Sequence, residues 1–201
     1  IPRCRGYLEL IRSEEGFAVV NVVSLEEYLY SVVPSEMPSS YPREALRAQA
    51  VCARTYAYGH MRHAAYPVYG AHVDDSTSFQ VYNNVSEQER TTTAVKETYG
   101  QLLYTAEGEL AGTYYYSTSC GVGSDANVWR TEAAGELSYL KAEAINPSSR
   151  QAAGDIGIGE YLRDEGHFAE FITSVNSDDF ESEEGWYRWS YSVEKLDPEY
   201  L

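Results

Sequence analysis

The chain has 201 residues, enough for one domain with a hydrophobic core, and its 31 acidic against 15 basic residues give a formal net charge of −16. Such an excess of negative charge repels nucleic acid and anionic lipid headgroups, so we exclude both as partners. No apolar run is long enough to span a bilayer. The first residue is Ile1 and not Met, so we expect any export signal or membrane anchor to lie upstream of this sequence.

The first 23 residues predict a β-hairpin. Residues 7–11 and 17–23 are rich in β-branched and aromatic side chains, which favour strands. Between them, residues 13–16 end in Gly16, a residue suited to a turn. We expect this hairpin to form one edge of a sheet.

Two helices are predicted next. Ser24 and Glu27 have the spacing of a capping box, and apolar residues then recur at helical spacing until Pro34, where we expect the helix to stop. A second helix is expected to begin near Pro42, since proline is tolerated at a first helical position. Its narrow apolar stripe of mostly small side chains consists of Leu46, Ala50, Ala53 and Ala57.

Glu36 lies in the short connection between these two helices. A carboxylate fixed by a stiff turn is well placed for acid or base catalysis, because the scaffold sets its geometry. The alternative is that Glu36 simply faces water, as most glutamates do.

The middle of the chain predicts a loop at residues 67–84, a helix from a Ser86 cap to Gly100, and a second hairpin. The strands of that hairpin are residues 101–105 and 110–117, which turn at residues 107–109.

The C-terminal part predicts a loop at residues 131–151, a helix at 160–175 and a half-buried strand at 186–193, whose aromatic side chains belong to the core or form a saccharide platform. The expected fold class is therefore α+β, with two β-hairpins packed against a pair of central helices. We expect a single domain over residues 1–201, made of an N-terminal hairpin (1–23), a motif-bearing core (24–130) and a C-terminal extension (131–201).

Metal binding is not expected. The histidines and acids of one region could be imagined as ligands, but their spacing does not supply a complete set: His60, His63, His72, Asp74 and Asp75. The three cysteines, Cys4, Cys52 and Cys120, include no CxxC pair and leave at least one thiol unpaired in a monomer. We therefore expect no metal and no cofactor.

Three ordered blocks resemble the SpoIID (stage II sporulation protein D) family and its LytB-type amidase-enhancer relatives. They are P-S-E-M-P at residues 34–38 with E-A-L-R-A-Q-A-V-C-A-R-T-Y at 44–56, D-S-T-S-F-Q-V-Y at 75–82, and Y-S-T-S-C-G-V-G at 116–123 running to N-V-W at 127–129. The resemblance implies a peptidoglycan lytic transglycosylase whose essential residue is the glutamate of the E-M-P motif, here Glu36. Some members of the family carry a metal site with cysteines flanking the D-S-T block, but this chain has Val73 and Phe79 there, so we expect no zinc. The resemblance also places Cys52 and Cys120 around one groove, which makes a bridge between them conceivable.

The expected activity follows from one good carboxylate candidate. The C6 hydroxyl of N-acetylmuramic acid attacks its own anomeric carbon, and Glu36 protonates the leaving oxygen and accepts the hydroxyl proton. Arg54 is assigned to structural pairing or substrate contact. The expected substrate-binding residues are neutral hydrogen-bonding groups and an aromatic face, together with Arg54: Gln49, Arg54, Gln80, Ser117, Ser119, Asn127 and Trp129.

Two further functions stay open. A non-catalytic amidase enhancer would share the three blocks and bind glycan or a partner amidase without cutting. A general carbohydrate-binding or adhesion domain has only the aromatic content in its favour. A serine hydrolase is disfavoured because no G-x-S-x-G elbow and no evident triad motif occurs. The expected partners are peptidoglycan glycan strands and other cell-wall hydrolases such as an amidase, in an extracytoplasmic location.

Overall fold

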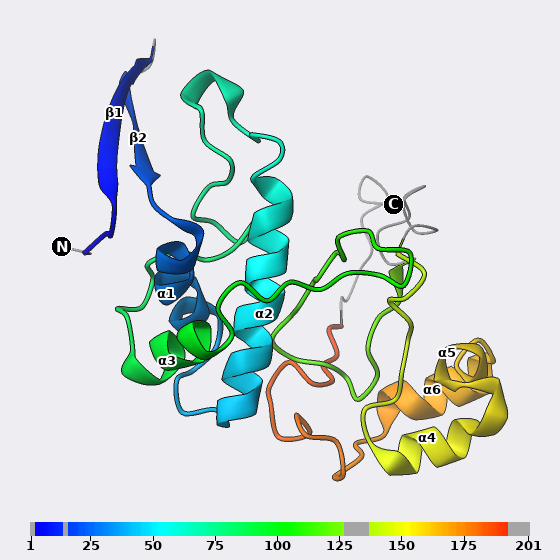
Figure 1. Cartoon of the computed structure of the whole chain (residues 1–201). Helices are drawn as coiled ribbons and strands as arrows, with labels where there is room; N and C mark the ends of the chain where they lie inside the picture. The colour runs from blue at the N-terminus through cyan, green and yellow to red at the C-terminus, as the bar shows by residue number, and fades with distance from the viewer. Residues whose placement is uncertain (1–2, 14–15, 127–136, 193–201) are drawn as a thin grey trace. The chain divides into compact units, whose positions relative to one another are not determined.

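The computed structural model describes residues 3–13, 16–126 and 137–192 (Figure 1). The chain forms two compact units, Ile1–Tyr115 and Tyr116–Leu201, and each is described by itself. None of the helices in the described ranges is both long enough and apolar enough to cross a membrane.

The N-terminal hairpin is confirmed. Strands β1 (Tyr7–Ser13) and β2 (Gly16–Val22) pair antiparallel, from Tyr7 opposite Val22 to Ser13 opposite Gly16. The chain enters β1 through Gly6, whose φ is +72° and whose missing Cβ would lie 2.0 Å from the carbonyl oxygen of Val22. Only glycine fits there. With several helices beside this sheet, the α+β class is confirmed.

Helix α1 (Leu25–Glu36) begins with the predicted capping box. Ser24 Oγ accepts a hydrogen bond from the Glu27 backbone N–H at 3.4 Å and donates one to the Glu27 carboxylate at 3.0 Å. The prediction that Pro34 ends the helix is wrong, since Pro34 lies buried inside it. Proline removes one N–H from the helix ladder, but the ladder resumes when the Met37 N–H bonds to the Val33 carbonyl at 2.9 Å. The extra turn places Glu36 on the helix itself.

Helices α2 (Arg43–His60) and α3 (Glu89–Glu97) pack with α1 to form the core of the first unit (Figure 1). Pro42 is the N-cap of α2, one position before the expected one. All four residues of the predicted small-residue stripe of α2 are buried. Helix α3 begins after Gln88 without a side-chain cap, so the predicted Ser86 cap is wrong. The core consists of Leu29, Val32, Val33, Ala50, Ala53 and Val95.

The loop predicted at residues 67–84 contains only a short 3-10 helix, η1 (Pro67–Tyr69). The second predicted hairpin is reduced to an isolated bridge between Tyr104 and Leu110. Its two segments bond to each other through the Thr105 N–H to the Glu109 carbonyl at 2.8 Å and the Ala111 N–H to the Leu103 carbonyl at 3.0 Å, and both also bond to α2. Leu103 N–H donates to Thr55 Oγ1 at 3.1 Å, and Thr113 Oγ1 donates to the Cys52 carbonyl at 2.7 Å. The pairing is thus confined to residues 103–111, and α2 holds both segments.

The second unit is built from short helices: α4 (Pro147–Ala153), η4 (Gly154–Ile156), α5 (Ile158–Tyr161) and α6 (Glu165–Thr173). Helix α4 was predicted as loop, although Asn146 before Pro147 is a recognisable start; the Asn146 side chain accepts from the Ser149 N–H at 2.8 Å. The helix predicted at 160–175 is interrupted where Asp164 caps α6. Residues 186–192 form turns and irregular chain, so the predicted strand is wrong in its described part.

Candidate functional site

Glu36 is the last residue of α1, and its carboxylate is held from a distant part of the sequence. Glu36 Oε1 accepts a hydrogen bond from the backbone N–H of Val81 at 2.6 Å. Val81 belongs to the segment 75–82, the second of the three motif blocks. The first unit thus brings two of these blocks together around one carboxylate.

Gln80 fixes the segment that carries this N–H group. Its side chain is only 1% exposed, donates to Tyr115 Oη at 2.9 Å and to the Ala53 carbonyl at 3.3 Å, and accepts from Tyr28 Oη at 3.3 Å. These bonds tie residue 80 to α1, to α2 and to the end of the first unit. A buried, satisfied amide of this kind fixes the backbone on either side of it.

The surroundings of Glu36 favour its protonated form. Removal of the carboxyl from water raises its pKa above the usual value of 4.5, and the Val81 N–H opposes that shift because it stabilises the carboxylate. Burial also raises the pKa of Tyr28 and of Tyr115, and the negative charge of Glu36 adds to both effects. Tyr41, which follows in the connection between α1 and α2, is 46% exposed.

An open pocket of about 520 Å³ lies in front of Glu36. Residues 34–40, which contain the E-M-P motif, form most of its wall, and Val85 and Gln88 complete it. Within the described part of the chain, Glu36 is the only carboxylate that lines this pocket. Its Oε1 is engaged by Val81, while Oε2 has no bonded donor among the described residues. One oxygen is therefore anchored, and the other has no donor among the described residues.

Arg54 pairs within the protein. It is 1% exposed, and its guanidinium bonds both oxygens of Glu26, at 2.7 and 2.9 Å, and the Val95 carbonyl at 3.0 Å. Of the two roles assigned from the sequence, this is structural pairing. Gln49 is 7% exposed, and its Nε2 has no hydrogen-bond partner among the described residues.

The other predicted substrate-binding residues belong to the second unit or lie outside the described ranges. Ser119 is 5% exposed and bonds the Glu181 carboxylate at 3.1 Å and the Gly121 N–H at 3.2 Å. The Ser117 hydroxyl accepts from Thr118 at 3.4 Å. Asn127 and Trp129 fall in the part that the structure does not describe.

The cysteines and histidines form no ligand cluster. Cys4, Cys52 and Cys120 are free thiols, so the conceivable bridge is not formed. In residues 3–13, 16–126 and 137–192, no group of three or more His, Cys, Asp or Glu side chains could hold a metal ion. His60 packs instead against Tyr56 and Phe79, with ring centroids 4.5 and 5.3 Å apart.

Sequence reasoning missed three groups around Glu36: the Val81 N–H, Tyr28 and Tyr115. A backbone N–H has no residue type to reveal it, and only its place in the second motif block could have indicated Val81. Tyr28 fitted the apolar face of the first helix, where it was read as core. Tyr28 does pack as expected, since its ring stacks on Tyr82 with centroids 5.1 Å apart. The same side chain also donates to Gln80, so it serves both the packing and the hydrogen-bond network.

Comparison with known proteins gives matches that agree with the motif blocks. Residues 13–104 match the sequence model of SpoIID, described as stage II sporulation protein. An uncharacterized protein of Brachyspira hyodysenteriae is 36% identical over 123 residues, 60% of this chain and 32% of that protein. Stage II sporulation protein D of Bacillus amyloliquefaciens is 36% identical over 137 residues, 61% of this chain and 39% of that protein. The amidase enhancer of Bacillus subtilis is 39% identical over 102 residues, 50% of this chain and 13% of that protein.

The matches therefore span only a minor part of each relative, from 13% to 39% of its length. The matched range contains α1, α2, α3 and both blocks that meet at Glu36. The first two motif blocks lie within it, and the third lies beyond its end. The similarity to the SpoIID family model is therefore a similarity of residues 13–104 of this chain.

Proposed function

We propose that this protein is a peptidoglycan lytic transglycosylase that cuts the bond between N-acetylmuramic acid and N-acetylglucosamine and leaves 1,6-anhydromuramyl ends. Glu36 is the acid and base of this reaction. The proposal combines the SpoIID resemblance with the geometry of the first unit. Its substrate is the glycan strand of the cell wall, and its place of action is outside the cytoplasm.

The observation that carries the proposal is the state of Glu36. Its carboxyl is anchored through one oxygen to the Val81 N–H at 2.6 Å, faces an open pocket, and has a pKa raised by burial. A general acid needs a pKa nearer to the working pH than that of an ordinary glutamate. It also needs a fixed direction, which α1 and the anchored oxygen supply.

The reaction needs one carboxyl group in two states. As an acid, Glu36 gives its proton to the glycosidic oxygen, and the bond from that oxygen to the anomeric carbon breaks. As a carboxylate, it takes the proton of the C6 hydroxyl while that oxygen bonds to the anomeric carbon and closes the anhydro ring. The proton that left is replaced, so Glu36 ends as it began and no water is consumed.

The absence of a second carboxylate among the described pocket residues favours this chemistry over hydrolysis. Glycoside hydrolases generally use two carboxyl groups, one as acid and one as base or nucleophile. In the pocket, the residues beside Glu36 are neutral, including Met37, Ser39 and Gln88. An internal hydroxyl nucleophile removes the need for a second acidic residue.

The test is mass spectrometry of the products formed from glycan strands, both peptide-bearing and denuded. Wild type is compared with Glu36→Gln, which keeps the oxygen that accepts from Val81 but cannot transfer a proton. The matched control is Glu107→Gln, a change of the same type in an exposed turn of the first unit. We expect anhydro ends from wild type and from the control, and none from Glu36→Gln.

Other outcomes would redirect the assignment. Ordinary reducing ends from wild type would mean hydrolysis and would require a second carboxylate. Anhydro ends from Glu36→Gln at the wild-type rate would refute the role of Glu36. Since denuded and peptide-bearing strands are scored separately, the same experiment identifies the preferred substrate.

A second candidate is a non-catalytic amidase enhancer. It is favoured by the match to the Bacillus subtilis amidase enhancer, 39% identical over 102 residues. In that case the protein binds the wall or a partner amidase, and no new ends of either kind appear. A purified amidase whose rate rises on addition of wild type and of Glu36→Gln alike would support this candidate.

A further inference from the structure

We propose that the second unit contains a saccharide-binding subsite of its own, in which Trp186 and Trp189 bind the face of a pyranose ring. The choice of a sugar of the cell-wall glycan rests on the function proposed above. The site itself rests on independent observations in a unit that lies beyond the SpoIID match at residues 13–104.

The first observation is the exposure of large aromatic side chains. Trp186 is 76% exposed and Trp189 is 67% exposed. The sequence assigned these aromatic side chains either to the core or to a saccharide platform. Of the aromatic residues in the segment 186–192, only Tyr187, 3% exposed, is buried. Indole groups that face water together indicate a binding surface, because their apolar area is otherwise hidden in the fold.

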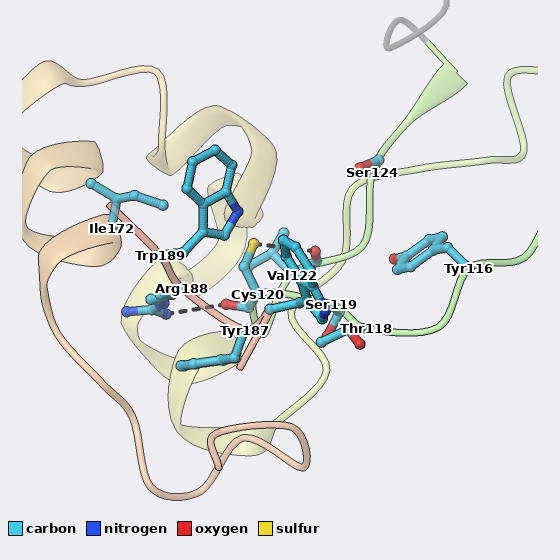
Figure 2. A pocket seen from close by; sticks show the side chains of 11 residues that line it. Tyr116, Thr118, Ser119, Cys120, Val122, Ser124, Ile172, Tyr187, Arg188 and Trp189 are labelled. Carbon is cyan, nitrogen blue, oxygen red and sulfur yellow. Dashed lines mark hydrogen bonds between the residues drawn. The ribbon is translucent and has the colours of Figure 1, made fainter. Parts of the chain in front are cut away.

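The second observation is that the two tryptophans line a concave pocket of about 430 Å³ (Figure 2). The segment 116–124 also lines this pocket and supplies hydroxyl groups from Tyr116, Thr118 and Ser124. A pyranose ring has an apolar face of C–H groups and an edge of hydroxyls. A pocket with aromatic faces and a few polar groups matches both, and its volume is that of a small-ligand site.

The third observation is that none of the described residues that line the pocket is acidic, although the chain has 31 acidic residues. Its one cation, Arg188, is occupied by the protein itself, through the Cys120 carbonyl at 3.1 Å, the Phe171 carbonyl and the Asp179 carboxylate at 3.7 Å. A neutral ligand rich in hydroxyls therefore fits better than a charged one.

The fourth observation is that a buried polar cluster holds the two walls together. Asp179, 3% exposed, accepts hydrogen bonds from Tyr187 Oη and from Asn146 Nδ2. It lies against Gly121, where an added Cβ would be 2.1 Å from an oxygen of Asp179. Arg188 ties the same turn to the tryptophan segment through the Cys120 carbonyl. Such prior organisation lowers the entropic cost of binding.

The test measures binding without turnover. In a Glu36→Gln background, the full chain is titrated with a tetramer of N-acetylglucosamine, by calorimetry and by intrinsic tryptophan fluorescence. The variant Trp186→Ala/Trp189→Ala is compared with Phe180→Ala, which removes an aromatic side chain that is 84% exposed in the same unit and does not line the pocket. We expect the tryptophan variant to bind roughly tenfold more weakly, a loss of about 1.4 kcal/mol, and Phe180→Ala to bind normally.

Because both tryptophans are exposed, their loss is expected to leave the unfolding midpoint unchanged, so weaker binding is not explained by misfolding. Equal affinity in all three proteins, or no binding of the tetramer at millimolar concentration, would overturn the subsite. Binding that depends on the tryptophans in a protein that cuts no glycan would retain the subsite and refute the proposed reaction. Cleavage by wild type, together with unchanged affinity in the tryptophan variant, would retain the proposed reaction and refute the subsite.

Discussion

Replacement of Arg54 by methionine tests whether this residue holds the first unit together. The guanidinium on α2 bonds both carboxylate oxygens of Glu26 on α1, at 2.7 and 2.9 Å, and the Val95 carbonyl on α3 at 3.0 Å. It therefore links the three helices whose side chains also share the core of the first unit. Methionine keeps much of the length and apolar volume of the side chain but removes every donor.

The expected loss is large because the pair is buried. The side chains of Arg54 and Glu26 are 1% and 16% exposed. Removal of one partner leaves a carboxylate with little access to water, and broken buried pairs typically cost about 3–5 kcal/mol. A domain of this size has a total stability of only about 5–15 kcal/mol, so the variant loses a substantial share of its stability.

The assay is urea denaturation, with the free energy of unfolding extrapolated to water. The matched control is Arg47→Met on the same helix, whose side chain is 32% exposed and pairs with Glu44, 70% exposed. An exposed pair contributes at most about 1 kcal/mol, so the control should change little. If Arg54→Met is as stable as this control and instead raises KM for glycan, the structural role is refuted and Arg54 contacts substrate.

Three further predictions concern single groups. Glu36→Gln should be more stable than wild type at pH 7. The folded-state pKa of Glu36 is raised above 4.5, so wild type loses stability as pH rises through the window from the unfolded to the folded pKa. The difference in stability between the two proteins should therefore vanish below about pH 4, where Glu36 is protonated in both states. Thermal melts of both proteins at a series of pH values test this, and a difference that does not change with pH would contradict it. Gln80→Leu should lower the free energy of unfolding by about 1–3 kcal/mol, because it leaves Tyr115 Oη and other buried groups without partners. It should also slow glycan cleavage. Urea denaturation and product assays measure the two effects, and unchanged values of both would contradict the positioning role of Gln80. Cys4 is exposed, whereas burial raises the pKa of the Cys52 thiol, so iodoacetamide should alkylate Cys4 first in timed peptide mapping, and equal rates would refute this order.

Much of the local structure could be predicted from the sequence, since its causes are local. Ser24 with Glu27 identified the start of α1, the β-branched and aromatic residues on either side of a glycine turn identified the hairpin, and the small-residue stripe of α2 is buried as expected. The motif around Glu36 singled out the candidate acid. Where local patterns failed, groups distant in the sequence supplied other partners: the predicted second hairpin keeps only the pairing around Tyr104 and Leu110, and Thr113 Oγ1 donates to the Cys52 carbonyl of α2.

The sequence by itself determined which residues can form helices, turns and an acid, because these properties depend on neighbours a few positions apart. Only the tertiary structure decided which groups surround the Glu36 carboxyl. The Val81 N–H is 45 positions from Glu36 in the chain, and Arg54 is 28 positions from Glu26. Hydrogen bonds and desolvation act between groups that are near in space, and folding alone sets those distances. The pKa of Glu36 is therefore set by the packing that removes the carboxyl from water, which raises it, and by the Val81 N–H, which opposes that rise, and no single motif contains both groups.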